Sequence, residues 1–171
     1  DCIPKGKGDF SVILTVDIGN TNITLGAYKN DKLEFTSRLS TDRHLTADQY
    51  AIDIKDILAL NNLAPDGIEG AIISSVVPIV GSNMKKAIKK LTGITPLAIG
   101  PGVKTGLNIR IDNPAQLGAD MVAGAVAAVA KYPLPCIVCD MGTATTISAI
   151  DKGGGFLGGA IAAGLGTTLE A

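Results

Sequence analysis

Short apolar runs rich in β-branched residues alternate with polar turns in the opening part of the chain. They predict three successive strands, at Ser11–Val16, Thr24–Tyr28 and Lys32–Arg38. The polar segment Lys29–Asp31 is short enough to join the second strand directly to the third. We therefore expect an antiparallel meander.

The spacing of apolar residues then changes to three or four, which indicates helices. Thr46 is a candidate N-cap with Gln49 at the third helical position, and the helical spacing lasts until Asn61 and Asn62. The elements that follow are a buried strand, a helix with its lysines outward and a further strand, at Ala71–Val77, Val80–Leu91 and Leu97–Ile99. The predicted order is β-β-β-α-β-α-β.

A third helix is expected to start at Asn113 as N-cap, with Pro114 at its first position, and to run through Tyr132. After Pro135 the pattern restarts with strands at Cys136–Asp140, Thr145–Ile150 and Phe156–Ile161, which repeat the opening of the first part. Three segments are therefore predicted: residues 1–10 as a disordered arm or expression remnant, 11–134 as a first domain, and 135–171 as the opening strands of a second, truncated domain. Helices to cover the second sheet are missing from this pattern, so we expect a shortened chain or a covering partner.

Composition narrows the class of protein. A chain of 171 residues with 46% hydrophobic and 18% charged residues is typical of a globular α/β protein. The longest apolar stretch, Met121–Ala130, is too short to span a bilayer. A net charge of −1 without a basic run argues against nucleic-acid binding, which needs clustered Lys or Arg.

Cys136 and Cys139 have the spacing of a zinc or redox motif, but on a strand they point to opposite faces. No second Cys/His pair completes four ligands, so we interpret them as reduced, buried thiols of a cytoplasmic protein. His44, in a polar loop, is expected to be solvated rather than catalytic.

One phosphate-handling pattern occurs twice, each time at the end of an apolar run. The first copy is Asp17-Ile-Gly-Asn-Thr21, and the second is Asp140-Met-Gly-Thr-Ala-Thr-Thr146. Each provides a carboxylate, a glycine that a phosphate can approach, and hydroxyl and amide donors. A single copy would be read as an ordinary Asp/Gly turn, whereas two copies favour two related half-sites.

Five motifs together resemble the type III pantothenate kinase family of the actin-like ATPase superfamily. They are the two turns above and the segments Gly100–Leu107, Asn113–Asp120 and Gly158–Ile161. The resemblance runs from Val12 to the last residue and lacks the family's C-terminal part. It implies ribonuclease H-like, duplicated βββαβαβ domains, the second incomplete, and a homodimer.

The resemblance also implies an activity, the ATP-dependent phosphorylation of pantothenate to 4'-phosphopantothenate, which is the first step of coenzyme A synthesis. Asp120 would accept the alcohol proton, and Asp140 would hold a monovalent cation, K⁺ or ammonium. Asp17 would hold Mg²⁺ through water, and Thr143 would contact ATP. The expected phosphate cradle is Ile18, Gly19, Asn20, Thr21, Asn22, Ile23 and Thr24, and the expected pantothenate contacts are Gly118, Ala119, Asp120 and Met121.

This chain departs from the family pattern at Met121, where the family has Arg, and at Ala163, where it has Pro. Methionine cannot donate a hydrogen bond to an anionic substrate. Two roles are open: Asp120 could be only a carboxylate that favours a helix N-terminus, and Lys104–Gly106 could be an ordinary polar loop or line the substrate. The competing functions are another small-molecule kinase of the superfamily and a non-catalytic accessory regulatory protein.

Overall fold

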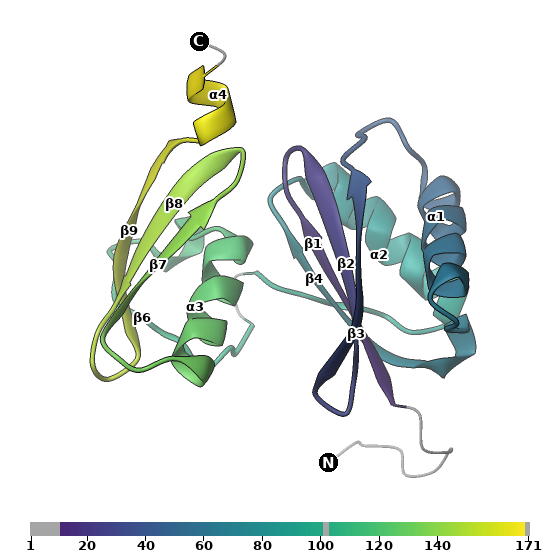
Figure 1. The fold of residues 1–171 in the computed structure, drawn as a ribbon, viewed down its shortest axis with the longest axis horizontal. Coiled ribbons are helices and arrows are strands. Elements are labelled where there is room, and N and C mark those ends of the chain that lie inside the picture. The colour runs from purple at the N-terminus through teal and green to yellow at the C-terminus, as the bar shows by residue number, and fades with distance from the viewer. Residues whose placement is uncertain (1–10, 101–102, 170–171) are drawn as a thin grey trace. The chain divides into compact units, whose positions relative to one another are not determined.

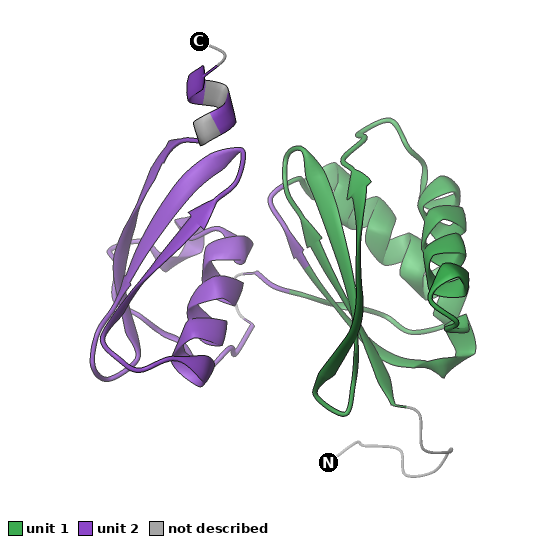
Figure 2. Cartoon of the chain, viewed as in Figure 1, with its two compact units in different colours: residues 1–73, 77–98 green, residues 74–76, 99–171 purple. Residues whose placement is uncertain are grey.

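The computed structural model describes residues 11–100 and 103–169, so the arm expected at residues 1–10 lies outside the described residues. The described chain forms two compact units (Figure 2). Unit 1 comprises residues 11–73 and 77–98, and unit 2 comprises residues 74–76 together with the described part of 99–169.

Unit 1 is a five-stranded sheet with the order β3-β2-β1-β4-β5 (Figure 1). Its strands are β1 Val12–Ile18, β2 Asn22–Lys29, β3 Lys32–Ser40, β4 Ile68–Ser75 and β5 Leu97–Ala98. The first three pair in antiparallel fashion, which confirms the predicted meander, and β4 pairs with β5 in parallel. Helices α1 (Ala47–Leu60) and α2 (Pro78–Thr92) lie side by side against this sheet. A short 3₁₀ turn, Pro65–Gly67, precedes β4.

The start of α1 follows directly from its sequence. The Thr46 hydroxyl accepts the backbone N–H of Gln49 at 3.3 Å, and the Gln49 side chain accepts the backbone N–H of Thr46 at 2.9 Å. This capping box was predicted, and it satisfies two N–H groups that the helix leaves without partners. α2 begins two residues before its predicted start because Pro78 occupies the first helical turn, where no N–H is needed.

Strand parity fixes which side chains of unit 1 enter the core. Val12, Leu14, Val16 and Ile18 of β1 are all buried, and they face the helices. Asp17 lies between two of them and is exposed on the opposite face, because successive strand residues point to opposite sides. The core is completed by residues four apart on the helices, Tyr50, Ile54 and Leu58 on α1 and Val80, Met84 and Ile88 on α2.

Unit 2 is a four-stranded sheet with the order β6-β9-β8-β7. Its elements are β6 Asn108–Ile109, α3 Ala119–Lys131, β7 Cys136–Met141, β8 Ala144–Ile150, β9 Gly155–Ala163 and α4 Leu165–Leu169. The antiparallel strands β7, β8 and β9 confirm the predicted repeat of the strand-hairpin-strand opening. β6 pairs with β9 in parallel and was not predicted.

The prediction that the third helix starts at Asn113 is wrong. Pro114–Gln116 forms only a 3₁₀ turn, and the Asn113 side chain makes no capping hydrogen bond. Leu117 and Gly118 are extended, with ψ of 124° and 144°, so the chain leaves the helical conformation before α3 begins at Ala119. The physical reason is that Leu117 packs against the apolar cluster of unit 2 instead of continuing a helix.

α3 packs against β7 and β8 through a cluster centred on Ala125, Ala128, Ile150 and Phe156. The small alanines let the helix lie close to the strands. This packing joins α3 to the later strands, so the two compact units divide near residue 99, whereas the sequence placed the domain boundary after residue 134.

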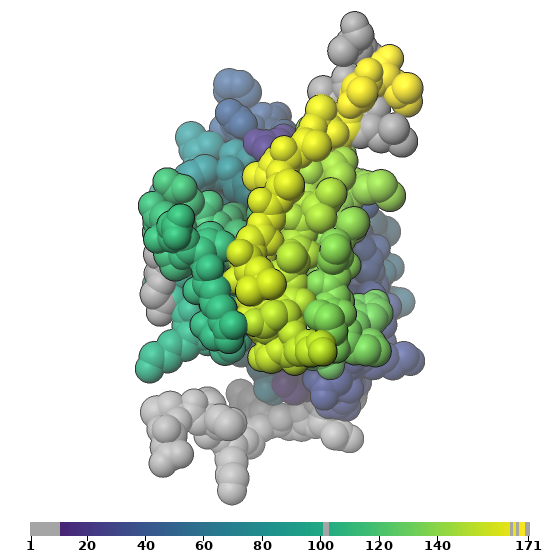
Figure 3. Space-filling view, turned by 90° about the vertical axis from the view of Figure 1, so that its left-hand side faces the viewer, coloured from purple at the N-terminus to yellow at the C-terminus, as the bar shows by residue number. Residues whose placement is uncertain are grey.

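The sheet face of unit 2 opposite α3, here called the outer face, is apolar and exposed. The register places Ile137, Cys139 and Met141 of β7 on it, beside Ile147 of β8. Ile137 is 68% exposed, Met141 79% and Ile147 41%. Figure 3 views the strands of unit 2 from this side, with β8 and β9 open to the viewer. This matches the expected uncovered sheet.

The two cysteines face opposite sides of β7, as predicted. Cys136 is half-buried against the α3 cluster, and Cys139 is exposed on the outer face. The expectation that both thiols are buried is therefore wrong for Cys139. Its face lacks a covering element among the described residues. Within that same part of the chain, no helix has the length and apolar character needed to cross a membrane.

A side-chain hydrogen-bond network closes the far end of unit 2. One oxygen of Asp151 accepts the backbone N–H groups of Gly153 and Gly155, each at 2.8 Å, and the other accepts Arg110 Nη1 at 2.7 Å. The Gly155 N–H, followed by the Gly153 N–H and the Arg110 guanidinium, holds the pKa of Asp151 below its usual value of 3.8. The ionised carboxylate therefore stabilises the hairpin between β8 and β9.

We expect Asp151→Asn to melt below wild type at pH 7, with the difference shrinking as the pH falls below 4. The sign follows from linkage, because the pKa of Asp151 is lower in the folded than in the unfolded protein. Its carboxylate therefore stabilises the fold at pH values above the unfolded pKa, and this stability is lost as the pH falls through the folded pKa. Thermal melts between pH 7 and pH 3 measure this, with the exposed Asp112→Asn as control. A pH-independent difference between Asp151→Asn and wild type contradicts the assignment.

Candidate functional site

The first candidate turn, residues 19–21, connects β1 to β2 in unit 1. The Gly19 N–H donates to the Asn22 carbonyl at 2.9 Å, and Asp17 lies directly opposite Thr24 in the register. A side chain at Gly19 would bring a Cβ to 3.3 Å from the Asn22 oxygen. The turn is therefore narrow, and glycine keeps its backbone open to an approaching anion.

A second segment, missed by sequence reasoning, holds this turn in place. Thr41 directly follows β3; its hydroxyl donates to the Gly19 carbonyl at 2.8 Å, and its N–H donates to the Thr21 carbonyl at 2.9 Å. Two hydrogen bonds to opposite ends of one turn fix its conformation. The sequence showed Thr41 only as part of a polar loop, because the contact spans 22 residues.

The second candidate turn, residues 142–143, connects β7 to β8 in unit 2. The Gly142 N–H donates to the Ala144 carbonyl at 3.0 Å, and Asp140 lies directly opposite Thr146. The two turns thus share an aspartate paired with a threonine on the next strand and a glycine whose N–H returns to a carbonyl across the turn. The repeated sequence pattern corresponds to a repeated local geometry, one residue shorter in unit 2.

Gly164 closes the second turn from the other side. Its N–H donates to the Thr143 carbonyl at 3.1 Å, and a Cβ at Gly164 would overlap the carbonyl oxygens of Gly142 and Thr143. Both neighbours are backbone atoms, so a side chain can be accommodated only if the turn or the start of α4 moves. The close approach requires glycine here for steric reasons.

Gly164→Ala is expected to destabilise the protein by about 1 to 3 kcal/mol, the usual cost of forcing an extra methyl group into a packed site. Chemical denaturation measures the free energy of unfolding. Gly166→Ala is the matched control, because a Cβ at this nearby helical glycine meets nothing within 4 Å. That variant should be neutral or slightly more stable, since alanine favours helix. An equal loss in both variants argues against the steric account.

Asp120 lies in the first turn of α3 and is half-buried. Its Oδ1 accepts the backbone N–H of Met121 at 2.8 Å, which holds the carboxylate back over the helix start. A Cβ at Gly118 would lie 2.5 Å from this Oδ1. Glycine at position 118 is therefore what gives the carboxylate its space.

α3 runs so that Asp120, Asp140 and Thr143 lie at the same end of unit 2. At the start of α3, Met121 lies close to Gly159 of β9, which pairs with Ser148 of β8. Near the end of α3, Val129 lies close to Gly154, in the hairpin between β8 and β9. Asp140 is on the α3 face of the sheet and lies across the strands from Thr146 and Ile161. This set is two residues along the strands from the pair Ser148 and Gly159, on the side away from the hairpin between β8 and β9. Asp140 and Ile161 in that set are exposed.

Met121 is partly buried and packs into unit 2. It packs against the α3 cluster, with its Sδ-methyl carbon close to Gly159. The side chain therefore contributes apolar packing between helix and sheet. A contact between Met121 and a substrate stays a prediction.

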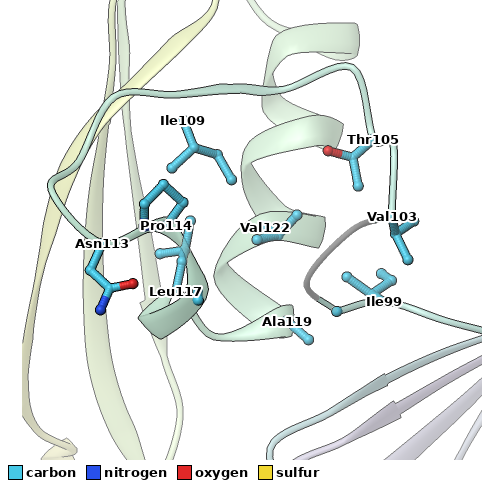
Figure 4. Close-up of a pocket in the computed structure, with 11 residues that line it drawn as sticks. Ile99, Val103, Thr105, Ile109, Asn113, Pro114, Leu117, Ala119 and Val122 are labelled. Carbon is cyan, nitrogen blue, oxygen red and sulfur yellow. The ribbon is translucent and has the colours of Figure 1, made fainter.

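A pocket of about 400 Å³ lies between the start of α3 and the segment that precedes it in unit 2 (Figure 4). Apolar side chains make most of its wall, among them Ile99, Val103 and Val122, while Thr105 and Asn113 are polar groups at its rim. Ala119 lines it directly beside Asp120. Of the segment Lys104–Gly106, Thr105 lines the pocket and Lys104 is exposed.

Each turn follows a strand that carries one carboxylate near its end, Asp17 on β1 and Asp140 on β7. Within the described ranges, 11–100 and 103–169, no three His, Cys, Asp or Glu side chains gather as a metal site. Mg²⁺ is commonly held by one or two carboxylates together with substrate phosphates and water. The Asp17 turn belongs to unit 1, and Asp120, Asp140 and Thr143 belong to unit 2.

Comparison with solved structures identifies the fold. The chain is similar to a reductive activator for corrinoid, iron-sulfur protein, with a TM-score of 0.55 and 10% identity over 86% of this chain and 30% of that one. It is also similar to an ethanolamine utilization protein from Carboxydothermus hydrogenoformans, with a TM-score of 0.50 and 16% identity over 98% of this chain and 55% of that one. At such low identity these likenesses show the fold alone, an α/β actin-like ATPase fold, as the sequence predicted.

Comparison of sequences identifies the family. Residues 13–171 match the family model described as type III pantothenate kinase. Type III pantothenate kinases of Listeria innocua serovar 6a and Listeria welshimeri serovar 6b are each 46% identical over 160 residues, which cover 94% of this chain. The matched region spans 62% of the length of these relatives. On these matches and its paired Asp/Gly turns, the chain belongs to the type III pantothenate kinase family.

Proposed function

We propose that this protein transfers the γ-phosphoryl group of ATP to the primary alcohol of pantothenate and so forms 4'-phosphopantothenate, the first step of coenzyme A biosynthesis. The observation that carries the proposal is the pair of matching Asp/Gly turns, each with a carboxylate and an open backbone at the end of a strand. Family membership supports the choice of pantothenate.

In this proposal the first turn binds the ATP phosphates. Residues 18–24 cradle the phosphates with backbone and hydroxyl donors other than the Gly19 N–H, which donates within the turn, and Asp17 orients a hydrated Mg²⁺. Bound Mg²⁺ supplies neutralisation of the charge on the transferred phosphoryl group. Thr41 keeps the turn in one conformation, so the donors need no rearrangement when ATP binds. Thr143 of the second turn contacts ATP, and Asp140 holds K⁺ or ammonium.

Asp120 is proposed to accept the proton of the pantothenate alcohol. Its carboxylate is held at the helix start by the Met121 N–H, which leaves a second oxygen for the hydroxyl. In a loose phosphoryl-transfer transition state the proton moves late, so a carboxylate of ordinary basicity suffices. The apolar pocket offers a place for the branched, apolar part of pantothenate, because Ala119, directly beside Asp120, and Thr105 both line it.

Substrate-dependent ADP release tests this proposal. The protein is incubated with ATP, Mg²⁺ and K⁺, together with pantothenate or an acceptor of another class, such as glycerol or acetate. We expect ADP release to need pantothenate and to fall when Na⁺ replaces K⁺. Release with acetate or glycerol instead identifies another kinase of the superfamily. ATP binding without release under any condition favours an accessory, non-catalytic protein.

The protein is proposed to act as a homodimer in the cytoplasm. The exposed apolar outer face of unit 2 supports self-association, because a twofold interface would remove it from water. The free thiols of Cys136 and Cys139 are consistent with a reducing compartment.

Light scattering at micromolar concentration is expected to give twice the mass of one chain, and Ile137→Lys on the outer face is expected to shift it toward the monomer. Ile52→Lys, which changes another exposed isoleucine on α1 of unit 1, serves as control. A folded wild-type monomer at this concentration rules out the dimer.

A further inference from the structure

Loop 41–46, between β3 and α1, is held rigidly against the first turn. Besides the two Thr41 bonds, the buried Tyr50 hydroxyl donates to the Asp42 carbonyl at 2.6 Å, and Asn83 Nδ2 of α2 donates to the Leu45 carbonyl at 3.0 Å. Both helices of unit 1 therefore fix the loop, and the loop fixes the turn. A side chain carried by this loop has a defined position relative to the turn.

Arg43 is that side chain. It is exposed, and its Nη2 lies 3.4 Å from Asn20 Oδ1, in the middle of the first turn. This distance exceeds the usual 2.7–3.2 Å of an N–H···O hydrogen bond. The guanidinium is thus placed at the turn without being committed to a strong partner there.

We propose that Arg43 is a phosphate-binding residue of the nucleotide site, with its guanidinium donating to the phosphate chain of ATP at the first turn. This inference rests on the proposed function, because it takes the first turn as the phosphate cradle. The chemistry fits: the planar guanidinium presents paired N–H donors to phosphate oxygens, and its charge does not depend on pH. The site has no P-loop lysine, and Arg43 supplies the missing positive charge.

Binding of ATP, ADP and adenosine to the full chain, measured by calorimetry, tests the inference with Arg43→Gln and Arg43→Lys. We expect Arg43→Gln to weaken ATP and ADP binding about tenfold, as for loss of a charge-assisted hydrogen bond at an exposed site, and to leave adenosine binding unchanged. Arg43→Lys should recover part of the loss, because it keeps the charge and loses the paired donors.

Lys32→Gln is the matched control, since it removes the same charge at the first residue of β3. Lys32 pairs with Lys29 at the end of β2 away from the turn, about 23 Å from it at the rise of an extended strand. It should bind all three ligands as wild type does. Equal ATP affinity in Arg43→Gln and wild type overturns the inference and leaves the proposed function standing. A loss of the same size for adenosine also overturns it, because Arg43 then only supports the turn through Asn20. If wild type binds neither ATP nor ADP, the proposed function fails together with the inference.

Discussion

Asp17→Asn is expected to lower phosphoryl transfer roughly 100-fold or more, an effect of the size seen when one preorganised electrostatic contact is removed from a reaction site. Asp17 is the carboxylate beside the first turn, and asparagine keeps its shape but loses the negative charge that orients hydrated Mg²⁺. The side chain is exposed and on the face away from the core, so unit 1 should remain folded. Steady-state kinetics at varied Mg²⁺ and a thermal melt measure the two effects.

Asp31→Asn controls for the loss of one charge in the same unit. Asp31 lies in the turn between β2 and β3 with a φ of 62°, a conformation that asparagine tolerates well. It should keep wild-type turnover and stability. Full activity in Asp17→Asn, or an equal loss in Asp31→Asn, would remove Asp17 from the nucleotide site.

Asp120→Asn is expected to lower kcat by about 10²- to 10⁴-fold, the range typical for loss of a general base. The amide oxygen of asparagine can still accept the Met121 N–H, so the start of α3 should persist. ATP affinity should stay within a factor of about two, because a base acts on the acceptor and not on nucleotide binding. The measurements are kcat and KM for both substrates.

Asp112→Asn, an exposed aspartate in the segment before α3, is the charge-matched control. The alternative for Asp120 is a carboxylate that only favours the N-terminus of a helix. In that case Asp120→Asn lowers the melting temperature while kcat at low temperature stays near wild type. Such a result contradicts the role as base.

Among the described elements, the strands other than β6 and the first two helices were predictable, because each carries a complete local signal. β1 shows its apolar alternation, and α1 shows its capping box within four residues. Where tertiary contacts determine whether a strand forms or where a helix starts, the sequence was insufficient to predict it. β6 has only two residues and is defined by its pairing with β9, and the helix start at Asn113 failed because Leu117 is drawn into the apolar cluster.

Some residues of the candidate site were predictable from the sequence, and others were not. The two aspartates and glycines of the turns were visible as a repeat, since each lies at the end of an apolar run. Their supports, Thr41 for the first turn and Gly164 for the second, lie about 20 residues away in the chain and act through hydrogen bonds to the backbone of the turn. Neither has a local pattern that distinguishes it from an ordinary loop residue.

Transfer of the γ-phosphoryl group from ATP to pantothenate is tested most directly by mass spectrometry of the product. The protein is incubated with Mg²⁺, K⁺, pantothenate and ATP that carries ¹⁸O in its γ-phosphoryl group. We expect 4'-phosphopantothenate to form and to carry the labelled phosphoryl group, and we expect Asp120→Asn to form far less of it. The label shows where the phosphoryl group comes from, because a group derived from inorganic phosphate in the solution would carry no ¹⁸O. Pantothenate that remains unmodified while the protein binds ATP would contradict the account.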